Sequence, residues 1–361
     1  MLIKAKTCVV HLTTVAGSMQ ASARLARFLA DTIGVALVDD ADSMFNFIRS
    51  TPCPAYGERD LTLIFVNGPI AFCGYRDEMG SEMLPRTQRV YWVSQDYTIT
   101  MPPNQAYSRP TKAETPFRAE FHKIPHVHLW STCQDVLQRR QQKRVPGYEL
   151  DEYVNWNALT YAPMPATPAI GGPIYPHLLY YGALRAGRTA RLGQFFGGVS
   201  DRVSISASNL NKNTAAQWRE LAPQARITEP LKGVATYTPT NGNKWGAQRL
   251  TQTIAMHRHS LYVADEESNT AFHSLANRFY EVLSTPYTVL WLDAAGARTY
   301  EQAGLRDWEQ FTVGDGHGLS VQLSLPAKNL RSLAAQQRKL WLATDPFKIL
   351  RDRVKQLARS L

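Results

Sequence analysis

HLLYYGALRAGR (residues 177–188) is the stretch that decides the fold of the second half of this chain. Its apolar start reads as a buried strand, and the residues after it read as a turn that leads into a helix. Gly182 and Gly187 permit tight backbone turns, and Arg185 and Arg188 stand where the helix begins. Because a helix N-terminus with arginines beside it suits phosphate groups, this segment predicts a nucleotide site.

SLYVADEESNTAFHSLANRFYEVLS (residues 260–284) repeats the pattern of strand, loop and helix. Asp265 closes the predicted strand, and Arg278 and Glu281 are one helical turn apart on a shared face. A carboxylate at Glu281 suits the ribose hydroxyls of a nucleotide. The alternative is that Arg278 and Glu281 form an ordinary ion pair on the helix surface, without a role in ligand binding.

Strands and helices alternate over most of the chain. The predicted strands are nearly continuous in apolar residues, which is typical of a parallel sheet covered on both faces; they lie at 7–12, 35–38, 61–67, 89–94, 177–181, 202–206, 260–264 and 287–292. Helices are predicted after the first strand and at 188–196, 271–283, 327–342 and 346–361. The segment 161–176 (YAPMPATPAIGGPIYP) is rich in proline and cannot form a helix, so it predicts a hinge. We therefore expect an α/β protein with Rossmann-like domains at 1–165 and 177–361, joined by a hinge at 166–176, with the last helices packing back on the first domain.

Length and composition limit the number of domains and the kinds of protein and site that this chain can form. A chain of 361 residues exceeds the usual size of a single hydrophobic core. No apolar run approaches a membrane span and no signal peptide is recognisable, so we expect a cytoplasmic protein with no membrane partner. The cysteines form no CxxC pair, and His122, His126 and His128 do not share a helix face, so no metal site is predicted.

The net charge of +10 favours a polyanionic partner. Between residues 109 and 144, basic side chains outnumber acidic ones and aromatic residues are interleaved, as suits DNA phosphates and bases. The residues expected to bind DNA are Arg109, Lys112, Arg118, Arg139, Arg140, Lys143 and Arg144, together with Asn67 in a separate loop. A solvated helix face around QRRQQKR is the alternative.

Five segments together resemble, in order and spacing, the DNA β-glucosyltransferase family of T-even phages. They are LTLIFVNGPIAFCGY (61–75), VYWVSQDYTITMP (90–102), YYGALRAGR (180–188), SLYVADEESN (260–269) and NRFYEVLST (277–285). The resemblance implies a GT-B glycosyltransferase architecture, in which two Rossmann-like domains face each other across a cleft. It also implies transfer of glucose from UDP-glucose to 5-hydroxymethylcytosine in duplex DNA, with inversion at the sugar and flipping of the base.

On this resemblance Asp96 falls at the catalytic base, which draws the proton from the acceptor hydroxyl. The alternative for Asp96 alone is a helix N-cap or a turn after a strand. Gly17 and Ser18 fall in a loop that approaches the donor sugar, or they form only the first turn from strand to helix.

The resemblance also assigns the UDP contacts. Arg185 matches a diphosphate arginine, while the family's second arginine falls on Thr189, so Arg188 or Arg191 has to replace it. Arg278 and Glu281 match the residues that bind UDP and its ribose, Asp265 matches a sugar-binding aspartate, and Trp245 lies where uracil is bound. The loop after Asp265 is longer here, which leaves the identity of the sugar open.

The implied ligands are a UDP-sugar donor, with UDP-glucose first, and double-stranded DNA that contains a modified pyrimidine. A divalent cation, Mg or Mn, is compatible with this chemistry but not required, and we expect a monomer. Two other functions stay open: a transferase of the same architecture with a small-molecule, lipid or protein acceptor, and a non-catalytic DNA-binding protein on a degenerate transferase fold.

Overall fold

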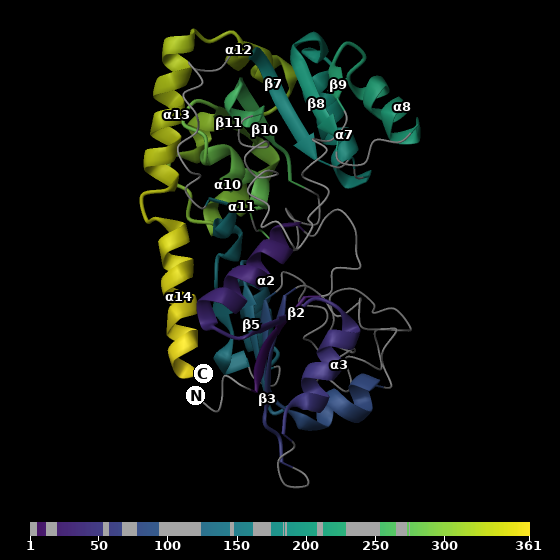
Figure 1. Cartoon of the computed structure of the whole chain (residues 1–361). Helices are drawn as coiled ribbons and strands as arrows, with labels where there is room; N and C mark the ends of the chain where they lie inside the picture. Colours follow the sequence, from purple (N-terminus) through teal and green to yellow (C-terminus); the bar gives the residue numbers. More distant parts are fainter. Residues whose placement is uncertain are drawn as a thin grey trace. The chain divides into compact units, whose positions relative to one another are not determined.

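The computed structural model describes residues 6–11, 20–52, 58–66, 78–93, 124–144, 148–161, 175–182, 184, 186–207, 212–228, 253–264, 273 and 275–361. The chain divides into two compact units (Figure 1). The N-terminal unit comprises Met1–Trp156 and Lys348–Leu361, and the C-terminal unit comprises Asn157–Phe347. In the described part of the chain, no helix is long and apolar enough to cross a membrane.

The N-terminal unit is built on a parallel sheet with strand order β2-β1-β3-β4-β5-β6. The strands are β1 (Thr7–Val10), β2 (Ala36–Val38), β3 (Leu61–Val66), β4 (Thr87–Val93), β5 (His126–Ser131) and β6 (Glu152–Tyr153). Every residue of β1 and β3 is buried, as their apolar sequences predict. The main helices are α2 (Gln20–Ile33), α3 (Ala41–Ser50), α6 (Gln134–Gln142) and α14 (Pro346–Ser360), with short helical turns η2 (Met79–Met83), η3 (Leu84–Arg86) and η5 (Tyr148–Leu150). The turn η6 (Trp156–Tyr161) lies almost wholly in the C-terminal unit.

The order of these strands places α2 and α3 on opposite faces of the sheet. The chain moves outward from β1 to β2 through α2, and then crosses back over β1 to β3 through α3. Right-handed crossovers in opposite directions cover opposite faces, and Figure 1 shows the two helices on either side of the strands.

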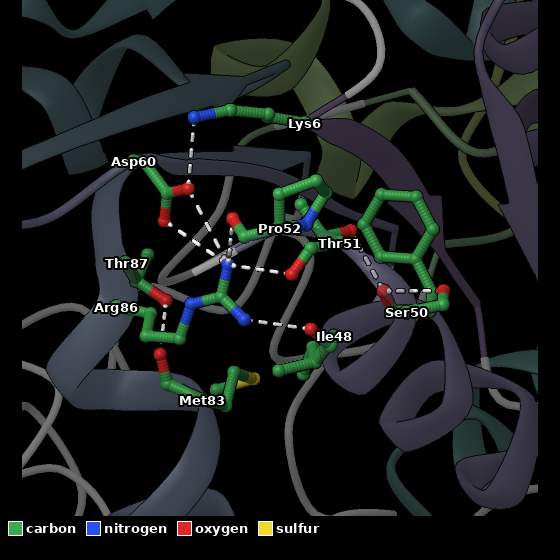
Figure 2. A network of polar contacts seen from close by, with 10 residues as sticks. Lys6, Ile48, Ser50, Thr51, Pro52, Asp60, Met83, Arg86 and Thr87 are labelled. Atoms are coloured by element: carbon green, nitrogen blue, oxygen red, sulfur yellow. Dashed lines mark hydrogen bonds and ion pairs between the residues drawn. The ribbon is translucent and has the colours of Figure 1, made fainter. Parts of the chain in front are cut away.

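A polar network ties the end of α3 to the amino edge of this sheet (Figure 2). The guanidinium of Arg86 donates to the carbonyl oxygens of Ile48 and Thr51 and pairs with Asp60, which also pairs with Lys6 at 3.1 Å. A cation at the last carbonyls of a helix satisfies groups that have no partner within the helix. The polar groups of this network at the amino edge therefore stabilise the fold. Ligands are expected at the opposite, carboxyl edge of the sheet.

The C-terminal unit has a second parallel sheet, with strand order β12-β11-β10-β7-β8-β9. The strands are β7 (Tyr175–Gly182), β8 (Val203–Ala207), β9 (Arg226–Thr228), β10 (His257–Tyr262), β11 (Val289–Asp293) and β12 (Thr312–Val313). The helices are α7 (Ala186–Phe196), α8 (Lys212–Leu221), α10 (Asn277–Leu283), α11 (Ala297–Gln302), α12 (Gly316–Leu323) and α13 (Ala327–Trp341), with short turns η7 (Ser200–Arg202), η10 (Ala294–Gly296) and η11 (Trp308–Phe311). Successive strands depart on either side of the β7–β10 pair, so this pair is the topological switch point.

Two apolar clusters fill the faces of this second sheet. Leu178 and Tyr180 belong to one cluster with Trp218, whereas Leu179 belongs to the other with Phe279, and Tyr181 packs against that second cluster. This alternation follows from the two-residue period of a strand. Both faces of β7 are thus buried, as predicted for a covered parallel sheet.

The predicted α/β class and most of the predicted strands are confirmed. The predicted helix at 271–283 is wrong in its first part, because α10 begins only at Asn277. His273 has a φ of 44° and Ala276 is extended, so neither continues the helix. Tyr175 and Pro176, placed in the hinge by sequence, are the first residues of β7, where a proline near the start of a strand is tolerated. The sequence interpretation missed α3, β5, β6, α8, β9, α11, α12 and β12.

Candidate functional site

The candidate site lies at the carboxyl ends of β7 and β10, at the switch point of the C-terminal sheet. Gly182 is the last residue of β7, and Val263 directly follows β10. Open α/β sheets bind ligands in the crevice beyond the strand ends at this place. The side chains that meet here come from α7 on one face and from α10 on the other.

Arg278, from the first turn of α10, reaches across this edge. Its guanidinium donates to the carbonyl oxygen of Tyr181 at 3.1 Å and to that of Val263 at 3.0 Å. It also lies over the rings of Tyr180 and Tyr262, with its central carbon 5.7 and 5.8 Å from their centroids. Arg278 thereby bridges the two strands and gives their shared edge a fixed positive charge.

Gly182 makes room for that guanidinium. Its φ of +140° is a conformation that side-chain-bearing residues rarely adopt, and a β-carbon here would lie 2.9 Å from Nη1 of Arg278. The same position is 3.7 Å from Nη1 of Arg188. The glycine predicted for a tight turn is therefore also the place where two arginines approach the backbone.

Arg188 enters from the other face of the sheet. It is 5% exposed, and its Nη1 donates to the hydroxyl of Tyr180 at 3.3 Å. Arg278 donates to the same hydroxyl at 3.3 Å, so two guanidinium groups share one phenol oxygen. Gly187, directly before Arg188, is exposed in the first turn of α7, where backbone N–H groups lack partners within the helix. Two cations next to a helix N-terminus favour an anion.

Glu281 supplies a carboxylate one turn after Arg278. The hydroxyl of Tyr181 lies 3.0 Å from Oε2 of Glu281. Burial raises the pKa of the Tyr181 phenol well above its ordinary value, and the charge of Glu281 raises it further. The phenol therefore keeps its proton and donates a hydrogen bond to the Glu281 carboxylate.

Arg191 does not join this cluster. Its guanidinium pairs with Asp293, a buried carboxylate at the end of β11, and also donates to the carbonyl of Gly314 at 3.2 Å. Of the two arginines considered to replace the one missing at Thr189, Arg188 is thus the one that the structure places beside Gly182 and Arg278.

Several of the residues chosen from sequence lie outside the described residues: Asp96, Gly17, Ser18, Arg185, Trp245, Asp265, Asn67, Arg109, Lys112 and Arg118. The described members that come together are Gly182, Gly187, Arg188, Arg278 and Glu281. Sequence reasoning missed Tyr180, Tyr181 and Tyr262. Strand alternation, which sends the hydroxyls of adjacent tyrosines to opposite faces, was the signal that was not used.

Arg140 requires a correction, because it cannot bind DNA phosphates in this structure. Its side chain is fully buried and ion-paired with Asp151, which also accepts from the backbone N–H of Leu129 at 2.9 Å. This pair joins α6 to the end strands of the sheet. Lys143 and Arg144 are exposed and Arg139 is half-buried, so the four described basic residues between 139 and 144 do not form one continuous surface.

Lys143 and Arg144 also follow the end of α6. A helix that follows a parallel strand runs back toward the amino edge of the sheet. The predicted base Asp96 follows β4, which ends at the carboxyl edge. The two exposed cations are therefore directed away from the edge at which β4 ends.

His126 and His128 belong to β5. His128 stacks on Tyr91 with ring centroids 4.5 Å apart. Burial lowers the pKa of His128 to about 4, with Arg89 and His126 adding to the shift, so it is a neutral core histidine. Among the described residues, no group of three His, Cys, Asp or Glu side chains could hold a metal ion.

No protein-family model matches the sequence, and no curated protein matches it either. Solved structures do match the whole chain. A β-glucosyltransferase described as a DNA modifying enzyme aligns with a TM-score of 0.58 and 11% identity over 98% of this chain and 97% of its own. The β-glucosyltransferase of phage T4 bound to UDP and Mn²⁺ gives 0.58 and 13%, and HepE of Anabaena bound to UDP-glucose gives 0.58 and 9%, each over 98% of this chain and 99% of the other. At these identities the likeness shows the fold, which is the two-domain α/β fold of GT-B glycosyltransferases.

Proposed function

We propose that the protein is a glycosyltransferase that takes its sugar from a UDP-sugar. The observation that carries this proposal is the pair of guanidinium groups of Arg188 and Arg278, which meet on the Tyr180 hydroxyl beside Gly182 at the switch point. A diphosphate is the anion that such a pair suits, because it presents oxygens to both cations. Glu281, one helical turn away, is proposed to bind the ribose hydroxyls of the same nucleotide.

The arginines also suit the chemistry of transfer. When the bond between sugar and phosphate breaks, negative charge grows on the departing UDP, and preorganised cations stabilise it more than they stabilise the intact donor. Burial strengthens this effect because the surrounding medium is less polarisable than water. Arg185, next to this loop in sequence, is proposed as a further phosphate ligand.

The proposed acceptor is duplex DNA that contains a hydroxymethylated pyrimidine, and the proposed sugar is glucose. The net charge of +10 supports a polyanionic partner, and one structural neighbour is described as a DNA modifying enzyme. Asp96 is proposed as the base that removes the proton of the acceptor hydroxyl, so that the sugar is inverted in a single displacement. The base must leave the helix to react, which costs a few kcal/mol.

The rest of the donor site is proposed from the resemblance. Asp265 and the loop with Gly17 and Ser18 are proposed at the sugar, and Trp245 at uracil. A neighbour binds UDP with Mn²⁺, and a divalent cation is compatible with this site but not required by the proposal.

The test is mass spectrometry of nucleosides after incubation with DNA and a panel of UDP-sugars. Duplexes with hydroxymethylcytosine, with hydroxymethyluracil and without modification separate the acceptors. The proposal expects a hexose on a modified pyrimidine only, and loss of transfer in the Asp96→Asn variant while UDP still binds. Absence of sugar on every DNA, with UDP-glucose bound, would reject the DNA acceptor.

A second candidate keeps the UDP-sugar donor but has a small-molecule, lipid or protein acceptor. The burial of Arg140 and the position of Lys143 and Arg144 favour it, because they reduce the basic surface near the end of β4. HepE, bound to UDP-glucose, has an equally similar fold. Slow hydrolysis of UDP-glucose without transfer to DNA would support this candidate.

A further inference from the structure

Tyr180 and Tyr181 are adjacent on β7, and their hydroxyls have opposite hydrogen-bonding roles at the site. The hydroxyl of Tyr180 accepts hydrogen bonds from Arg188 and Arg278 on one face of the sheet. The hydroxyl of Tyr181 donates to Glu281 on the other face. The Tyr180 hydroxyl therefore links the two arginines, and the Tyr181 hydroxyl links β7 to the carboxylate on α10, the helix that also carries Arg278.

The contact between Tyr181 and Glu281 links β7 to α10. The phenol oxygen is 3.0 Å from Oε2 of Glu281 and 3.3 Å from the carbonyl oxygen of Arg278, one turn earlier on the same helix. The hydroxyl thus lies beside one turn of α10 and reaches both a side chain and the backbone. Because the phenol is part-buried and stays protonated, it holds an ionised carboxylate in one orientation.

We propose that Tyr181 is a positioning residue that orients Glu281 and makes the donor site select ribonucleotides over 2′-deoxyribonucleotides. The inference rests on the proposed function, because it requires a nucleotide at this site. Glutamate is a flexible side chain, and fixing one of its oxygens removes the entropy cost of ordering it when the ligand binds. A carboxylate held toward the 2′ and 3′ hydroxyls is left with an unpaired acceptor when the 2′ hydroxyl is missing, and that penalty is the source of selection.

The test measures the binding of UDP and of 2′-deoxy-UDP by calorimetry to the wild-type protein and two variants. Tyr181→Phe removes the hydroxyl and keeps the ring. Tyr287→Phe is the matched control, because it removes a phenol from the surface of the same unit. Wild type and control are expected to bind UDP at least about tenfold more tightly than 2′-deoxy-UDP. Tyr181→Phe is expected to bind UDP about tenfold more weakly and to lose less affinity for 2′-deoxy-UDP, which keeps only the 3′ hydroxyl contact, so that the preference for UDP falls.

A double-mutant cycle with Glu281→Gln shows whether the two residues act together. If Tyr181 works through Glu281, adding Tyr181→Phe to Glu281→Gln causes no further loss of UDP affinity. A residue with a merely structural role would weaken both nucleotides equally and would act in both backgrounds.

Three results overturn the inference without touching the proposed function. One is an equal loss of UDP and 2′-deoxy-UDP binding in Tyr181→Phe, and another is additive effects in the cycle. The third is wild-type protein that binds both nucleotides equally, which leaves the UDP site intact but removes the ribose selection. Wild-type protein that binds neither nucleotide overturns the proposed function itself, and the inference with it.

Discussion

Gly182 and Arg278 fit together so closely that a β-carbon on the first would lie 2.9 Å from a guanidinium nitrogen of the second. The glycine ends β7, and the arginine bridges β7 to the residue after β10. A strand end and a helix that are far apart in sequence thus depend on each other. Because Gly182 has no side chain, the Arg278 guanidinium can lie at the carboxyl ends of β7 and β10 and give this part of the edge a positive charge.

Gly182→Ala is therefore expected to displace Arg278 and to weaken UDP binding. Its φ of +140° adds backbone strain of about 1–3 kcal/mol to the displacement. A charged hydrogen bond contributes roughly 1.5–3 kcal/mol, so we expect affinity for UDP to fall about tenfold or more. Calorimetric titration with UDP and a thermal melt measure both effects.

Gly198→Ala is the matched control for this experiment. Gly198 is exposed in the same unit, and a β-carbon there meets nothing within 4 Å. It should leave UDP affinity unchanged. Unaltered UDP affinity in Gly182→Ala as well would show that Arg278 takes no part in binding.

Alanine substitutions of Arg188 and Arg191 are expected to have different effects, one on UDP affinity and the other on stability. Arg188→Ala removes a cation beside Gly182 and should lower UDP affinity about tenfold, since it removes a charge-assisted contact. Arg191→Ala leaves the buried carboxylate of Asp293 without its ion pair and should lower the free energy of unfolding by about 1–3 kcal/mol, with little effect on UDP. Urea unfolding and UDP titration on both variants separate the two roles. A reversed pattern would assign the second phosphate contact to Arg191.

Substitution of Arg140 is expected to lower the free energy of unfolding and to have no direct effect on DNA binding. Arg140→Met leaves Asp151 as an unpaired buried charge, which costs about 3–5 kcal/mol of unfolding free energy. The double variant with Asp151→Asn should recover much of this loss. By contrast, Lys143→Ala with Arg144→Ala should leave both stability and the salt dependence of DNA binding unchanged, because these exposed residues are directed away from the edge at which β4 ends. Electrophoretic mobility shifts at several salt concentrations measure that slope.

The sequence predicts the fold well wherever a strand is apolar throughout. Residues 61–66 and 90–93 are almost entirely apolar because helices cover both faces of the sheet, and the pattern needs no tertiary information. It fails at β5, where His126 and His128 alternate with apolar residues, and no strand is predicted there. His128 is buried there against Tyr91, a contact that only the pairing of β4 with β5 creates.

The candidate site is predictable in part for the same reason. Arg278 and Glu281 are one turn apart in any helix, so their shared face follows from the sequence. That Arg188 rather than Arg191 joins them depends on Asp293, more than a hundred residues from either arginine along the chain. The burial of Arg140 likewise depends on Asp151, and a basic run in sequence does not reveal which of its members is turned inward.

The free energy of unfolding is expected to decrease as the pH is lowered, because buried histidines stay neutral in the folded protein. The indole N–H of Trp291 donates to Nδ1 of His259 at 3.1 Å, so that nitrogen must stay unprotonated. Burial lowers the pKa of His259 to about 3, and nearby arginines add to the shift, whereas the unfolded chain titrates near 6.5. Below pH 6.5 the unfolded state binds the proton and the folded state does not, so the unfolding free energy decreases from pH 6.5 downward and the loss is complete below about pH 3.

His259→Gln should flatten this dependence, because glutamine accepts from the indole and does not titrate. The expected change between pH 6.5 and 4 is about 1–3 kcal/mol, and urea unfolding at each pH measures it. His128, with a pKa of about 4, adds a similar contribution from the N-terminal unit. An unchanged slope in His259→Gln would mean that this histidine is already protonated in the folded protein.

The central claim is that the β7–β10 edge binds the diphosphate of a UDP-sugar, and calorimetric titration of UDP-glucose into wild-type protein and Arg278→Gln tests it most directly. We expect saturable binding of one UDP-glucose per chain, and affinity at least about tenfold weaker in Arg278→Gln, which loses a charged contact. Wild-type protein without saturable binding, or Arg278→Gln with wild-type affinity, would contradict the claim.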